Sequence, residues 1–220
     1  MIYFYGTSHA AQHLRSAAEQ KGVKVVDAPE AAEVLFVSED TPTDLEGKRD
    51  LRPVIGYLVE ARQHGKPIVL TSQVPPGFTR ALDYPQIYHQ AETLRIKDAM
   101  ERALEPEQII VGARTYQSIS FLPKAYLEYL EVFHCPVQMM TYEDAEFSKI
   151  AINMFLAAQV DATNRMADVA RRVDANWWAV SQVLKRDKRI GPHAYLEPGR
   201  WQDSLHLLRD HYTVEAILAR

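Results

Sequence analysis

Residues 142–173 form a stretch of the chain without a single glycine or proline. The stretch is rich in Ala, Leu, Met and Ile, which favours one helix of about 45 Å at a rise of roughly 1.5 Å per residue. A second helix is expected over 177–185, followed by breaks at Gly and Pro and a closing segment at 201–219. We therefore predict an all-helical domain over 137–220, built on one long central helix.

The first part of the chain alternates between short apolar runs and helix-compatible stretches. The expected strands are 2–5, 23–26, 34–37, 67–70 and 109–112, and the expected helices are 9–21 and 51–63. Alternation of this kind is typical of a parallel sheet with helices on its faces. We predict an α/β fold class, with a reduced Rossmann-like, dinucleotide-binding domain over 1–136.

The composition of the chain excludes several kinds of ligand and partner. The formal net charge of −4 and the pI near 6.1 argue against a surface that binds nucleic acid. The single cysteine, Cys135, excludes a disulfide framework and is expected to be a buried structural thiol. His9 and His13 share a helix face without a third ligand, so no metal site is expected. No stretch approaches the roughly 18 apolar residues of a membrane span, and we expect a cytoplasmic protein that binds no membrane.

The turn after the first strand carries a partial dinucleotide fingerprint. A GxGxxG or GxGxxA sequence lets the backbone approach a pyrophosphate at a helix N-terminus, and residues 6–11 read Gly-Thr-Ser-His-Ala-Ala. Gly6 and Ala11 match the pattern, whereas Ser8 replaces its middle glycine. Asp27 ends the next expected strand, where a ribose-binding acid belongs. A dinucleotide site and a plain strand–helix turn without a ligand are equally compatible with so short a pattern.

Lys149 and Asn153 lie four residues apart on the expected long helix, so both side chains project from one face. An amine and an amide placed in this way can grip a substrate hydroxyl or carbonyl, and a partly buried lysine can stabilise a developing alkoxide. By spacing alone, a solvated lysine beside an exposed amide is the favoured interpretation, because such pairs are common on helix surfaces.

Short characteristic segments follow one another along nearly the whole chain. They are Thr-Pro-Thr at 41–43, Ser-Gln-Val-Pro-Pro-Gly at 72–77, Glu-Thr-Leu-Arg at 92–95, Glu-Pro-Glu-Gln-Ile-Ile-Val-Gly at 105–112, Glu-Phe-Ser-Lys-Ile-Ala-Ile-Asn-Met-Phe-Leu-Ala at 146–157, Arg-Ile-Gly-Pro at 189–192 and Pro-Gly at 198–199. In this order they resemble the UDP-glucose/GDP-mannose dehydrogenase family of nucleotide-sugar 6-dehydrogenases. The resemblance implies NAD as cofactor, a nucleotide-sugar substrate, and a homodimer formed through the long central helix.

The resemblance also assigns residues. Lys149 and Asn153 fall on the family's catalytic lysine and its asparagine partner, and Glu92 falls on an acid of its Pro-Glu-Phe-Leu-Arg-Glu motif. The expected cofactor-binding residues are Gly6, Ser8, Ala11, Asp27, Thr41 and Pro42. The expected substrate-binding residues are Leu94, Arg95 and Arg189.

Departures from the family limit the expected chemistry. Family members oxidise an alcohol to an acid in two hydride transfers through a cysteine-bound hemithioacetal, which needs a thiolate. The family's Gly-Gly-Ser-Cys-x-x-Lys-Asp segment is replaced at 203–210, where Ser204 and His206 are the nearest substitutes for the thiol. The family also has an additional loop and helix between the positions of Asp27 and Ala32, and a second nucleotide-binding domain after Asp210. We expect a truncated and divergent member.

Two functions from different classes remain open from the sequence, and a third possibility is a different reaction in the same pocket. The first is an NAD-dependent oxidoreductase that acts on the CH–OH group of a nucleotide sugar, without the cysteine-dependent second oxidation. The alternative is a non-catalytic binding or scaffold homologue that keeps the fold and the dimer, because one fold can host many functions.

Overall fold

The computed structural model describes residues 1–219, and its contacts group the chain into two compact units. The sheet unit comprises Met1–Pro42 and Arg49–Lys149, and the helical unit comprises Thr43–Lys48 and the chain from Ile150 onward. The expected division into domains at residue 136 stays a prediction. Each unit is described by itself.

The sheet unit is built on six strands in the order β1-β2-β3-β4-β5-β6. The strands are β1 (Ile2–Tyr5), β2 (Val34–Val37), β3 (Ile68–Leu70), β4 (Ile87–Gln90), β5 (Ile109–Ala113) and β6 (Val137–Thr141). All neighbours are parallel except β4 and β5, which are antiparallel. The four residues of β2 are all buried, as expected for a strand covered on both faces.

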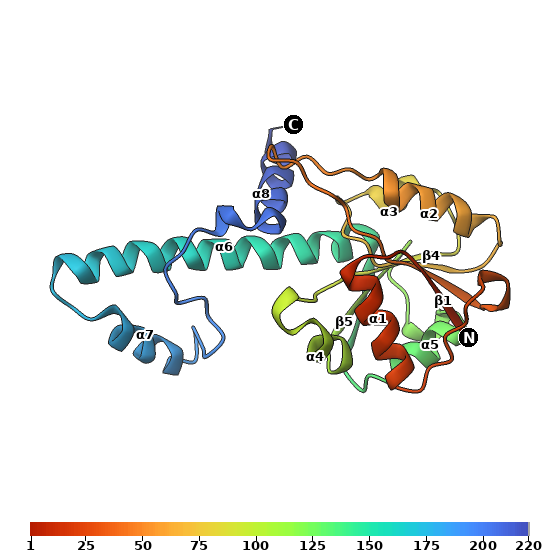
Figure 1. Cartoon of the computed structure of the whole chain (residues 1–220), viewed down its shortest axis with the longest axis horizontal. Helices are drawn as coiled ribbons and strands as arrows, with labels where there is room; N and C mark the ends of the chain where they lie inside the picture. Colours follow the sequence, from red (N-terminus) through yellow and green to blue (C-terminus); the bar gives the residue numbers. More distant parts are fainter. Residues whose placement is uncertain (220) are drawn as a thin grey trace. The chain divides into compact units, whose positions relative to one another are not determined.

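Helices cover both faces of this sheet (Figure 1). One face packs against α1 (His9–Gln20), α4 (Ala99–Leu104) and α5 (Lys124–Glu131). The other packs against α2 (Arg52–Arg62) and α3 (Phe78–Ala81). On the first face Phe36 contacts the rings of Phe4, Tyr126 and Tyr129, which makes it the centre of an aromatic cluster. The predicted α/β fold class, a Rossmann-like sheet followed by a long helix, is confirmed.

The order in which segments are added to the sheet reverses at β1. After α1 the backbone of Lys24 and Val26 pairs with Ile2 on one side of β1, while β2 pairs on the other side. Ligands of open α/β sheets bind where the strand order reverses, at the carboxyl ends of the strands. The turn at Gly6 lies at this point.

Three details of the sheet differ from the sequence-based expectation. Residues 23–26 do not form a strand, because only Val25 makes a bridge, to Ile2. Strand β4 was not expected, and for β6 only a strand start at Cys135–Pro136 was expected. The sequence Ile-Tyr-His-Gln of β4 contains two polar residues, and β6 is only partly buried, so neither has the continuous apolar run of a central strand.

The long helix α6 (Tyr142–Arg172) confirms the helix predicted from the run without glycine and proline. Within the helical unit it is followed by α7 (Trp177–Arg186) and α8 (Leu205–Leu218). The connection between α7 and α8 is tied to α6 through backbone contacts, such as Asn164 Nδ2 to the Gly199 carbonyl at 2.7 Å and Thr163 Oγ1 to the Tyr195 carbonyl at 2.7 Å. Among the helices of residues 1–219, none combines the length and the apolar character needed to cross a membrane.

Candidate functional site

The turn between β1 and α1 has the backbone form of a dinucleotide site. Gly6 has a φ of +113°, and a Cβ at this position would lie 2.2 Å from the Ser38 carbonyl oxygen at the end of β2. Only glycine tolerates both conditions. The turn then leads directly into α1, so its backbone N–H groups lie at a helix N-terminus, where anions bind favourably.

The side chains at this turn are already engaged within the protein. The Ser8 hydroxyl accepts the Ala11 N–H at 3.1 Å and donates to the Ser38 carbonyl at 2.8 Å, so Ser8 acts as the N-cap of α1. The Thr7 N–H donates to Glu39 Oε2 at 2.8 Å. Two backbone donors of this turn, the Thr7 and Ala11 N–H groups, are therefore engaged within the protein.

The other expected cofactor residues lie around the same end of the sheet. Asp27 accepts a hydrogen bond from Arg15 of α1 at 2.8 Å, and its side chain is 95% exposed. Thr41 is buried and its hydroxyl donates to the Gln73 carbonyl at 3.2 Å, whereas the neighbouring Pro42 is exposed. These contacts tie the 41–43 segment to the 72–77 segment, two stretches that the family resemblance had identified separately.

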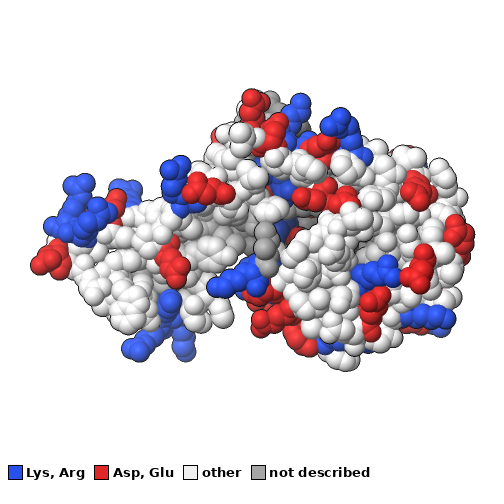
Figure 2. All heavy atoms as spheres, in the orientation of Figure 1, with Lys and Arg blue, Asp and Glu red and all other residues white. Residues whose placement is uncertain are grey.

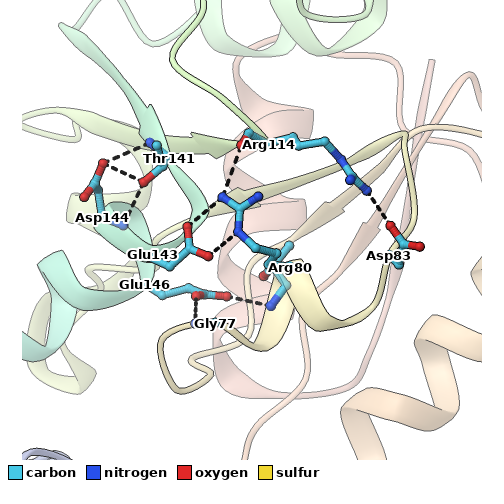
Figure 3. A network of polar contacts seen from close by, with 9 residues as sticks. Gly77, Arg80, Asp83, Arg114, Thr141, Glu143, Asp144 and Glu146 are labelled. Carbon is cyan, nitrogen blue, oxygen red and sulfur yellow. Dashed lines mark hydrogen bonds and ion pairs between the residues drawn. The ribbon is translucent and has the colours of Figure 1, made fainter. Parts of the chain in front are cut away.

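Glu146 joins the start of α6 to the loop after β3 (Figure 3). Its carboxylate accepts the Gly77 N–H at 2.6 Å and the Thr79 N–H at 2.8 Å, and the side chain is almost completely buried. Burial raises the pKa of Glu146, although the hydrogen bonds from the loop oppose the shift. The contact places the Pro-Pro-Gly loop within one helical turn of Lys149.

A second group of polar side chains surrounds this contact (Figure 3). Arg80 forms a bidentate ion pair with Glu143 on the first turn of α6 and also donates to the Arg114 carbonyl at 3.1 Å. Arg114 in turn donates to Asp83 at 2.8 Å. Since α3 carries Arg80 and Arg114 directly follows β5, the network fixes the start of α6 against α3 and the end of β5.

Lys149 is half-buried on α6, and no hydrogen bond or ion pair joins its ammonium group to any of residues 1–219. Lysines that are partly buried usually find a partner, because a desolvated charge is costly. An ammonium group without a partner is available for a ligand.

Asn153 lies one turn further along α6 and belongs to a buried polar cluster of the helical unit. Its Nδ2 donates to Asp210 Oδ2 at 2.7 Å, and Asp210 and Arg209 on α8 are 0% and 2% exposed. Arg209 and Asp210 were not among the residues predicted from the sequence. The signal was present, because the eight positions 203–210 correspond one by one to Gly-Gly-Ser-Cys-x-x-Lys-Asp, which aligns Arg209 and Asp210 with the closing Lys-Asp and His206 with the cysteine.

The remaining predicted residues do not gather at one place. Glu92 and Leu94 line a small recess of the sheet unit next to Leu14, Arg102 and Phe133. Arg95 is ion-paired with Asp98, and Arg189 with Asp187 at 2.7 Å. Figure 2 shows such acidic and basic side chains interspersed over the face drawn. Within residues 1–219, no cluster of three or more His, Cys, Asp or Glu side chains has the arrangement of a metal site.

Comparison with known proteins identifies the class. Residues 143–204 match the central domain of the UDP-glucose/GDP-mannose dehydrogenase family. The putative UDP-glucose 6-dehydrogenase of Bacillus subtilis is 27% identical over 214 residues, which cover 90% of this chain and 49% of that protein. The UDP-glucose 6-dehydrogenase of Rickettsia typhi is 30% identical over 172 residues, which cover 72% of this chain and 39% of that protein. The chain thus spans at most about half the length of these relatives.

Solved structures show the same fold. The UDP-glucose dehydrogenase of Pyrobaculum islandicum matches with a TM-score of 0.71 at 21% identity, over 97% of this chain and 64% of that one. The GDP-mannose dehydrogenase of Pseudomonas aeruginosa matches with a TM-score of 0.69 at 16% identity, over 97% of this chain and 65% of that one. The resemblance to the UDP-glucose/GDP-mannose dehydrogenase family is thereby confirmed.

Proposed function

We propose that the chain is an NAD-dependent oxidoreductase that converts the CH–OH group of a nucleotide sugar to an aldehyde. The observation that carries the proposal is Lys149, a half-buried ammonium group without a partner among residues 1–219, inside the stretch that matches the dehydrogenase family. When bound, NAD supplies the acceptor for the hydride.

The chain's own residues have distinct roles in this proposal. Lys149 polarises the reacting oxygen and stabilises its developing negative charge. Asn153 orients that oxygen, and its contact with Asp210 holds the amide in one orientation. Glu92 assists proton transfer through water. Leu94, Arg95 and Arg189 are the proposed substrate contacts.

The lack of a cysteine at positions 203–210 limits the reaction to one oxidation. His206 stands where the family has its cysteine, and neither its imidazole nor the Ser204 hydroxyl can form the hemithioacetal through which the second oxidation proceeds. The proposed product is therefore the aldehyde.

The proposal includes a homodimer in the cytoplasm. In the helical unit, Ile152, Phe155, Met166 and Val169 are exposed and recur at helical spacing along one side of α6, and the exposed Val173 directly follows the helix. An apolar stripe of this length is the kind of surface that a second copy covers.

The second candidate is a non-catalytic binding or scaffold protein. The hydrogen bond from the Thr7 N–H to Glu39 favours it, because this bond takes a donor that a dinucleotide would need. Calorimetry that detects no NAD binding, together with tight binding of another small molecule or protein, would select this function over the enzyme.

The test is NADH formation with UDP-glucose or GDP-mannose, followed for the wild type, Lys149→Ala and Lys124→Ala. Lys124 is the matched control, since its side chain is 90% exposed. We expect activity in the wild type and the control and its loss in Lys149→Ala. No turnover and no NAD binding by the wild type would reject the proposal.

A further inference from the structure

We infer that Glu39 sets the affinity of the β1–α1 turn for a dinucleotide, by holding its own carboxylate where a phosphate group would bind. The inference rests on the proposed function, since it assumes a dinucleotide at this turn. Glu39 directly follows the buried residue Ser38 at the end of β2, and it therefore reaches the turn from the neighbouring strand.

The contacts of the carboxylate are those of a bound anion. Glu39 Oε2 accepts the Thr7 N–H at 2.8 Å and lies 3.4 Å from the Thr7 hydroxyl. Glu39 Oε1 accepts the Asp40 N–H at 2.8 Å. Phosphates at the N-terminal ends of helices are held by the same kinds of donor, backbone N–H groups together with hydroxyl groups.

Ser8, which replaces the middle glycine of the fingerprint, also reduces the number of free donors at the turn. Ser8 uses its hydroxyl to bridge the Ala11 N–H and the Ser38 carbonyl, so another donor of the first turn is taken. Because Gly6 has no Cβ, the backbone of the turn can lie close to the Ser38 carbonyl, and this space is therefore occupied by the protein and not by a ligand. The turn is thus closed by contacts with the residues that end β2.

Negative charge near the turn further opposes the binding of a phosphate group. Glu39 and the exposed Asp40 place two carboxylates beside the turn, and a pyrophosphate carries negative charge as well. Arg15, the nearby cation of α1, is engaged by Glu19 and Asp27. A dinucleotide can bind at this turn only after the Glu39 carboxylate leaves the Thr7 N–H, which lowers the observed affinity.

The experiment measures dissociation constants by calorimetry for NAD and for inorganic pyrophosphate. The proteins are the wild type, Glu39→Gln, Glu39→Ala and the control Asp40→Asn, which removes the same charge from a side chain that does not contact Thr7. We expect both Glu39 variants to bind NAD and pyrophosphate at least about tenfold more tightly than the wild type, whereas Asp40→Asn gains no more than about threefold. Thermal unfolding checks that all four proteins fold.

The outcomes separate this inference from the proposed function. A gain in pyrophosphate binding specific to Glu39, without NAD binding in any variant, supports the role of Glu39 and rejects the NAD-dependent function. Tight NAD binding by the wild type with no gain in the Glu39 variants overturns the inference and leaves the function intact. Equal effects of the Glu39 and Asp40 substitutions, or no effect on either ligand, also overturn it.

Discussion

Lys149 and Asn153 occupy neighbouring turns of one helix, yet their environments differ. Lys149 is half-buried without a partner among residues 1–219, whereas Asn153 is 6% exposed and hydrogen-bonded to Asp210. Their spacing predicted a shared face but not this difference. The amide is therefore part of the fold of the helical unit as well as a proposed substrate contact.

Replacing Asn153 by aspartate is expected to destabilise the protein more than replacing it by alanine. In Asn153→Asp, two carboxylates face each other in a buried site, and the expected loss of unfolding free energy is about 3 kcal/mol or more. Asn153→Ala removes the amide that donates to Asp210 Oδ2, and the expected loss of unfolding free energy is about 2 kcal/mol. Urea unfolding measures both, and equal losses would contradict the pairing with Asp210.

The buried imidazole of His89 is expected to make the stability of the protein depend on pH. The side chain is 2% exposed in β4, its Nδ1 has no partner among the described residues, and burial lowers its pKa to about 3. The unfolded chain therefore binds a proton more readily than the folded chain between about pH 6.5 and pH 3. Within this range His89 is expected to reduce stability by up to about 1.4 kcal/mol per unit fall in pH.

The measurement compares unfolding free energies at several pH values for the wild type, His89→Gln and the exposed control His193→Gln. The difference between wild type and His89→Gln should shrink as the pH falls below 6.5, while the control follows the wild type. Parallel curves for all three proteins would show that His89 titrates normally in the folded state.

At the scale of elements, the first turn of α6 is fixed to the loop between β3 and α3. Glu146 accepts two backbone N–H groups of that loop, and Glu143 binds Arg80 of α3. Because Lys149 is the last residue of the sheet unit and follows on the same helix, these contacts fix the turn of α6 that precedes it.

Glu146→Gln tests this arrangement. The glutamine amide can accept only one of the two N–H groups and brings its own NH₂ group against the other, so a loss of about 2 kcal/mol in unfolding free energy is expected. Glu143→Gln on the same helix turn is the control, with an expected loss below about 1 kcal/mol because its side chain is 39% exposed. A smaller loss for Glu146→Gln than for Glu143→Gln would contradict the proposed importance of the buried carboxylate.

The same elements show how far sequence reasoning reaches. The uninterrupted run at 142–173 predicted α6, and alternating apolar runs predicted most of the sheet, because periodicity and helix propensity are local properties. The contact between Thr7 and Glu39 and the pair of Asn153 with Asp210 join residues 32 and 57 positions apart. Local patterns contain no information about such pairs, so the closure of the turn could not be predicted.

At the scale of the whole molecule, the exposed apolar stripe of α6 predicts self-association. Phe155 is 75% exposed and is the most exposed side chain of this surface, so Phe155→Glu is expected to place a charge in the subunit contact and yield a monomer. Val59→Glu is the matched control, since Val59 is 57% exposed on α2 of the sheet unit. Light scattering coupled to size exclusion measures the mass, and a wild-type monomer at micromolar concentration would contradict the dimer.

The most direct test of the account is the amount of NADH formed per molecule of nucleotide sugar consumed, with Lys149→Ala measured in parallel. The account predicts one NADH per sugar together with an aldehyde product, and no NADH from the variant. Two NADH per sugar, an undiminished rate in Lys149→Ala, or no NADH from the wild type would contradict it.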